Sequence, residues 1–88
     1  MGGGDMDLEK LRSSTNKTIG TRQTRKALER GHVAEVFVAR DAADEVVDPV
    51  VKMSDDQGVT VKHVDTMMEL GQACGISVGA AVAALLRD

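Results

Sequence analysis

The segment Gly20–Gly31, GTRQTRKALERG, has the pattern of an amphipathic helix bounded by a glycine at each end. Its predicted inner face is made by three residues at helical spacing, Thr24, Ala27 and Leu28. A cation at Arg30 followed by Gly31 is a common way for a helix to end. The chain then changes to a mostly apolar run, Val33–Ala39, which predicts a buried strand. This change from helical to strand pattern indicates an α/β fold.

The first turns of this predicted helix carry an unfavourable charge. Arg22, Arg25 and Lys26 lie near its N-terminus, where the helix dipole already places partial positive charge. Each such cation costs roughly 0.3–1 kcal/mol at an exposed site. A bound phosphate group would remove this penalty, because the free N–H groups at helix N-termini bind anions. The segment therefore predicts a phosphate-rich partner, and a solvated basic surface is the alternative.

Helical and strand patterns alternate along the rest of the chain. We expect helices over residues 6–13, 49–57 and 65–74, and strands over residues 18–19, 59–63 and 80–86. Pro49 is expected in the first turn of its helix. The residues expected to face the core around that helix and the following strand are Val46, Val50, Val51, Met53, Val59, Val61 and His63. With residues 33–39, these patterns predict a three-layer α/β/α sandwich with a small mixed sheet of four strands.

Length and composition fit one small domain. The chain has 88 residues, 42% of them hydrophobic, with Phe37 as its sole aromatic residue. We assign residues 1–5 to a flexible, glycine-rich N-terminal tail and residues 6–88 to the domain. We expect no signal peptide or membrane span, because the basic and apolar segments that these require are missing. The single Cys74 fits a reducing compartment, so we expect a cytoplasmic protein. Without a clear dimer surface, a monomer is expected.

Charge is distributed unevenly along the chain. Residues 10–30 hold seven basic residues against Glu29 alone, whereas residues 41–88 hold nine acidic and three basic residues. The net charge of −3 therefore conceals a basic region around the predicted helix. Because local fields decide nucleic-acid binding, the acidic balance of the whole chain does not exclude it. Without aromatic residues for stacking, RNA would be held through phosphates, polar base-edge contacts and aliphatic side chains.

Catalytic and metal sites are not predicted. The carboxylates within residues 41–48 lack the spacing and the central glycine of a calcium loop, so helix capping and solubility explain them better. His32 and His63 are too isolated for a zinc site. Cys74 could be a nucleophile with His63 as its base, but the C-terminal end of a helix raises a thiol pKa. We therefore expect no enzyme activity, no metal and no cofactor.

A second segment, Gly75–Gly79 with the sequence GISVG, completes a specific resemblance. In order and spacing, Gly20–Asp41 and Glu69–Ala81 resemble motifs of the L7Ae family of ribosomal proteins, in particular its bacterial L7Ae-like group. The similarity extends from residue 18 to residue 86. It implies an α/β/α sandwich, here residues 6–88, that binds kink-turn RNA, an internal loop with tandem sheared G·A pairs and a sharp bend. It also implies a ribosomal or ribosome-associated role.

The resemblance further implies that the first segment inserts at the G·A pairs and that the second covers a flipped-out nucleotide. The residues to which it assigns RNA binding are Gly20, Thr21, Arg22, Gln23, Lys26, Ile76, Ser77 and Val78. Gly20, Thr21 and Lys26 fit the family pattern, whereas Arg22 replaces its usual Asn and Gln23 its usual Glu. The lost carboxylate would weaken base recognition. The alternative function is therefore a protein-interaction module on the same fold with weak, nonspecific RNA binding.

Overall fold

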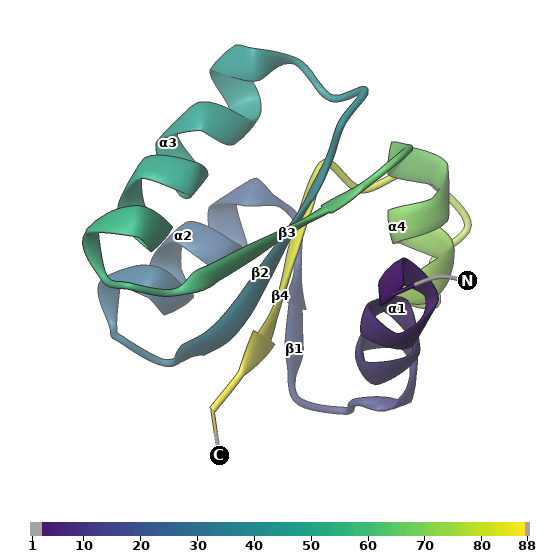
Figure 1. The fold of residues 1–88 in the computed structure, drawn as a ribbon, viewed down its shortest axis with the longest axis horizontal. Coiled ribbons are helices and arrows are strands. Elements are labelled where there is room, and N and C mark those ends of the chain that lie inside the picture. The colour runs from purple at the N-terminus through teal and green to yellow at the C-terminus, as the bar shows by residue number, and fades with distance from the viewer. Residues whose placement is uncertain (1–2, 88) are drawn as a thin grey trace.

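Residues 3–87, which the computed structural model describes with side chains from residue 8 onward, form four helices and a four-stranded sheet (Figure 1). In chain order the elements are α1 Gly3–Ser13, β1 Lys17–Ile19, α2 Thr21–Glu29, β2 Val33–Ala39, α3 Asp44–Asp56, β3 Thr60–Val64, α4 Met67–Ala73 and β4 Val82–Leu86. The strand order is β1-β4-β2-β3, with β2 and β3 parallel and the other neighbours antiparallel. The predicted mixed sheet is confirmed.

Helices cover both faces of the sheet. α2 and α3 lie on one face and α1 and α4 on the other (Figure 1). The central strand β2 is buried on both faces, since its adjacent residues Val36 and Phe37 point to opposite sides and are both fully buried. Leu28 of α2 and Leu70 of α4 are fully buried in the two helical layers. The apolar run that follows the first helix segment therefore forms the centre of an α/β/α sandwich, as predicted.

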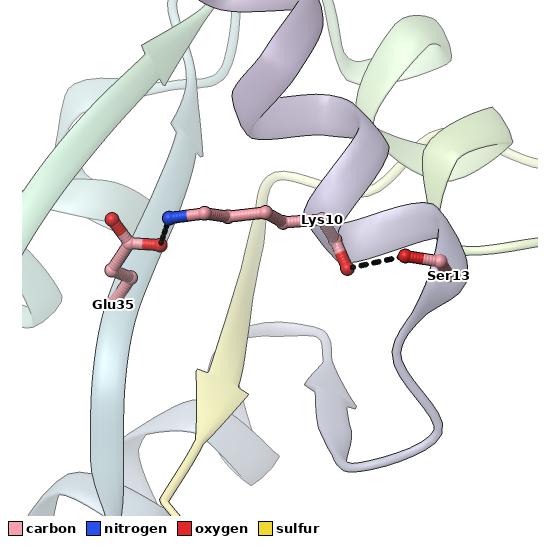
Figure 2. A network of polar contacts seen from close by, with 3 residues as sticks. All are labelled: Lys10, Ser13 and Glu35. Carbon is pink, nitrogen blue, oxygen red and sulfur yellow. Dashed lines mark hydrogen bonds and ion pairs between the residues drawn. The ribbon is translucent and has the colours of Figure 1, made fainter.

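α1 begins at Gly3, before the expected residue 6, and so includes part of the predicted tail. Residues 1 and 2 of the expected tail lie outside the described residues. At the other end of α1, the Ser13 hydroxyl lies 3.5 Å from the Lys10 carbonyl oxygen, and Lys10 Nζ lies 3.7 Å from Glu35 Oε1 on β2 (Figure 2). This ion pair joins α1 to the sheet.

α3 differs most from the prediction. It begins at Asp44, so that Pro49 lies inside the helix and not in its first turn. Proline has no N–H to donate, and the helix lacks one backbone hydrogen bond there. Asp44 and Glu45 in the first turn favour this earlier start, because carboxylates stabilise a helix N-terminus.

The earlier start also changes which residues of α3 face the core. Val47 and Val50 are buried, whereas Val46 is 38% exposed, so the expectation that Val46 faces inward was wrong. Val51 and Met53 are partly buried against the core, which is the side of the helix on which they were predicted to lie.

The remaining elements lie close to their expected positions. His63 is exposed on the edge strand β3, and Val64 is the buried residue at its end, so the inward assignment of His63 was wrong. Before α4, the Thr66 hydroxyl accepts the Glu69 N–H at 3.1 Å and caps the helix. No helix of the described residues has the length and apolar character needed to cross a membrane.

Candidate nucleic-acid interface

The two segments assigned to RNA binding meet at one end of the sheet. β1 and β4 pair antiparallel with Ile19 opposite Ala83, and the next residue, Gly20, donates its N–H to the Val82 carbonyl oxygen at 2.8 Å. The start of α2 therefore lies beside the start of β4, which directly follows the loop of residues 75–81. On the other side of β4, the Ala39 N–H donates to the Ala81 carbonyl oxygen at 2.9 Å. The end of this loop is thus held between β1 and β2.

The backbone of Gly20 has a conformation that only glycine adopts readily. Its φ is 98° and its ψ is 159°, and a side chain at this position would be strained. As the N-cap residue of α2 it offers no side chain to accept the N–H groups of the first turn, and no acidic residue lies in that turn. These N–H groups and the positive end of the helix dipole are therefore open to an anion.

A hydroxyl pair fixes the orientation of α2 on the sheet. Thr18 Oγ1 on β1 and Thr24 Oγ1 on α2 lie 2.8 Å apart in a hydrogen bond, and Thr24 is fully buried. Because α2 is held by this face, its opposite side points to solvent, and Arg22, Gln23 and Lys26 are all exposed. The structure thus brings together the polar residues that the sequence assigns to RNA contact.

A hollow of about 590 Å³ lies on the side of α2 that carries Arg22 and Lys26. It is lined by Thr21, Arg22, Arg25, Lys26 and Glu29. The ion pairs recorded over residues 8–87 join α1 to β2 and Arg40 to Asp65, and so involve none of the α2 cations. The three cations can therefore act on a bound anion. Arg25 was absent from the predicted site, although its i, i+3 spacing from Arg22 places it on the same side of the helix.

The loop of residues 76–78 presents one apolar side chain to solvent. Val78 is 64% exposed and Ser77 is exposed, whereas Ile76 is partly buried against the core. The Ile76 N–H donates to the Gly71 carbonyl oxygen of α4 at 3.0 Å. A Cβ on Gly71 would overlap the Val78 carbonyl oxygen, so glycine allows the loop to lie directly on α4. Ile76 thus anchors the loop, and Val78 projects from it.

The structure gives the catalytic alternative no support. Cys74 is 5% exposed, and burial raises the pKa of its thiol, an effect that the charge of Lys17 partly offsets. At neutral pH the thiol is therefore protonated and weakly nucleophilic. Asp41, from the acidic stretch, accepts the Met67 N–H at 2.8 Å and has a structural role at the start of α4. Among the residues that the structure describes, no group of three or more His, Cys, Asp or Glu residues could hold a metal ion.

The chain is similar to known proteins over most of its length. The model of the ribosomal protein L7Ae/L30e/S12e/Gadd45 family matches residues 5–88. An RNA-binding protein of Halalkalibacterium halodurans is 48% identical over 80 residues, which cover 91% of this chain and 98% of that protein. The large ribosomal subunit protein eL8 of Haloquadratum walsbyi is 40% identical over 80 residues, which cover 90% of this chain and 67% of that protein.

A solved structure, that of a 15.5kD RNA binding protein of Giardia lamblia, matches with a TM-score of 0.82 and 27% identity. The match covers 92% of this chain and 68% of that one. The family match and these relatives confirm the family resemblance that the two sequence motifs indicated. The structural match also supports the predicted α/β/α sandwich.

Proposed function

The chain belongs to the ribosomal protein L7Ae/L30e/S12e/Gadd45 family, and on that premise we propose that it recognises kink-turn or related internal-loop RNA with sheared G·A pairs. Relatives named as RNA-binding proteins and as a large ribosomal subunit protein support a non-enzymatic RNA-binding role. We also propose that the protein is cytoplasmic, monomeric when free, and ribosomal or ribosome-associated.

The exposed surface of α2 suits a distorted RNA groove. The major groove of a regular A-form helix is too deep and narrow for side chains to read. An internal loop opens that groove, so the N-terminal end of α2 can enter it with Gly20 closest to the RNA backbone. In this arrangement Arg22 and Lys26 bind phosphates, and the Gln23 amide makes hydrogen bonds to a base edge.

The loop beside α2 supplies the second part of the contact. Val78 is exposed and apolar, so it can cover the face of a base that has left the stack. The observation that carries the proposal is the hydrogen bond from Gly20 to Val82, because it places this loop next to the N-terminus of α2. A sharply bent RNA presents both a phosphate-rich groove and an extruded nucleotide to such a surface.

Titration of two labelled RNAs tests the proposal. One is a kink-turn, and the other is a duplex of equal length in which Watson–Crick pairs replace the G·A pairs. We expect the kink-turn to bind more tightly by roughly tenfold or more, an effect of about 1.4 kcal/mol. Equal affinities at every salt concentration would instead indicate the protein-interaction module, with RNA held only by nonspecific electrostatics.

A further inference from the structure

A hollow of about 350 Å³ lies between the first half of α3 and the carboxyl ends of β2 and β3. We call it the α3–β3 groove. Its floor is apolar and consists of Val38, Ala39, Ala42, Val47 and Val51. Its rim is polar and consists of Arg40, Asp44, Asp48 and His63. None of the residues that we assign to RNA contact lines the groove, so it is a separate surface.

The strand that borders this groove lies at the edge of the sheet. Within residues 3–87, β3 pairs with β2 alone. Val64 of β3 faces β2, since its carbonyl oxygen accepts the Arg40 N–H at 2.7 Å. Backbone groups alternate in direction along a strand, so Val61 and His63 direct their N–H and C=O groups away from β2. Such an edge is a template for pairing with another extended chain.

Charge on the α3 side of the groove determines which kind of chain fits there. Asp44 and Asp48 line the groove, and Asp55 follows Asp48 by seven residues, about two helical turns, on the same flank of α3. All three are exposed and outside the ion pairs recorded over residues 8–87. The arginine of the rim, Arg40, has its Nε 3.6 Å from Asp65 Oδ1, so a carboxylate already offsets its charge. The α3–β3 groove therefore complements a basic occupant.

We propose that the α3–β3 groove docks an extended segment of a partner protein that carries lysine or arginine side chains. The backbone of this segment pairs with the outward groups of Val61 and His63 and adds a strand to the sheet. His63 and Val38, its partner in register, both line the groove, so alternate side chains of the added strand point toward the α3 carboxylates. Backbone pairing supplies affinity, and the carboxylates select basic side chains. The inference is independent of RNA binding, because α2 contributes no residue to the groove.

A peptide of defined sequence tests this docking surface on the full-length protein without RNA. The probe is a heptapeptide of alternating threonine and lysine with blocked ends, since alternation places all its lysines on one face of a strand. During NMR titration, backbone amide shifts should change saturably at residues 44–51 and 60–64. Hydrogen exchange of the Val61 and His63 amides should slow in parallel. Absence of a saturable change, or changes confined to other residues, would overturn the proposal.

Two control peptides separate backbone pairing from charge. A backbone N-methylated form of the lysine peptide keeps its charge but cannot donate hydrogen bonds to β3, and a peptide of alternating threonine and glutamate keeps the donors but reverses the charge. Neither should bind. Equal binding of the N-methylated form would exclude strand addition, and equal binding of the glutamate peptide would exclude selection by the α3 carboxylates.

Asp48→Asn should weaken binding of the lysine peptide by roughly two- to fivefold, the range for one exposed ion pair. Asp56→Asn is the matched control, because Asp56 is an exposed aspartate of α3 outside the groove. It removes the same charge from the chain and should leave the affinity nearly unchanged. An equal loss for the two variants would overturn the assigned site. Since no RNA is present, failure of this test leaves the proposed function standing.

Discussion

The Gly20 N–H donates a 2.8 Å hydrogen bond to the Val82 carbonyl oxygen, which joins the start of α2 to the start of β4. Two segments far apart in the sequence thereby form one surface. One segment contributes cations and free N–H groups, and the other contributes the exposed Val78.

Lys26 lines the hollow beside α2 together with Arg22 and Arg25, so its ammonium group should make a central phosphate contact. Lys26→Ala should weaken binding to every RNA and reduce the salt slope by about 1. Lys52→Ala, at an exposed lysine of the acidic helix α3, is the control and should change neither quantity. Fluorescence titration at several salt concentrations measures both. A slope equal to that of the unmodified protein would exclude Lys26 as a phosphate contact.

Gln23 is exposed on the side of α2 that we assign to the base edges. Gln23→Glu restores a carboxylate, and charge-assisted hydrogen bonds are roughly twice as strong as neutral ones. The ratio of affinities for the kink-turn and the regular duplex should therefore increase. Gln72→Glu, at an exposed glutamine of α4, adds the same charge elsewhere and should leave the ratio unchanged. If Gln23→Glu does not raise the ratio, the side chain does not read the G·A pairs.

Val78 is 64% exposed, so little folding stability depends on its side chain. Val78→Asn should change the free energy of unfolding by no more than about 0.5 kcal/mol, as expected of a surface substitution. It should nevertheless weaken kink-turn binding, because a polar side chain covers an extruded base less well. Val46→Asn on α3 is the matched control at another exposed valine. Equal RNA affinities for the two variants would show that Val78 makes no contact.

Gly71 allows the loop to pack on α4, since a Cβ there would overlap the Val78 carbonyl oxygen. Gly71→Ala should lower the free energy of unfolding by about 1–3 kcal/mol, the usual cost of overpacking. It should also displace the loop and reduce kink-turn affinity more than affinity for the regular duplex. Urea denaturation and RNA titration measure the two effects, with Gln72→Ala as the neighbouring exposed control. Stability equal to that of the unmodified protein would contradict the close packing.

Burial raises the pKa of the Cys74 thiol in the folded protein. The unfolded thiol ionises near its ordinary pKa of 9.0, while the folded thiol keeps its proton to higher pH. Above the pKa of the unfolded thiol, the unfolded state binds fewer protons than the folded state. The free energy of unfolding should therefore fall as pH rises. The chain has no tyrosine to titrate in the same range, and Cys74→Ala should flatten this fall. Urea denaturation between neutral and alkaline pH measures it, and equal pH dependence in both proteins would refute the assignment.

Sequence patterns predicted correctly those elements in which the spacing of apolar residues matches the burial seen in the fold. Thr24, Ala27 and Leu28 are all buried, as their helical spacing indicates, and the apolar run of β2 lies at the centre of the sheet. Pro49 misled the prediction of α3, because proline usually marks a first turn but here lies within the helix. Within α3 the prediction therefore placed Val46 on the inner face, where Val47 lies, although it placed Val50 correctly.

The candidate site was only partly predictable. The α2 cations and the glycine-flanked loop could be found from the sequence, because charge and glycine spacing are local signals. Their proximity depends on the pairing of β1 with β4, which no local pattern specifies.

The most direct test of the account is a map of backbone amide chemical shifts by NMR during titration with kink-turn RNA. We expect the largest changes to occur together at residues 20–26 and 76–78. The regular duplex should shift the α2 amides but leave the loop amides unchanged. Changes concentrated on α3, or loop amides that respond no more to the kink-turn than to the duplex, would contradict a single surface for bent RNA.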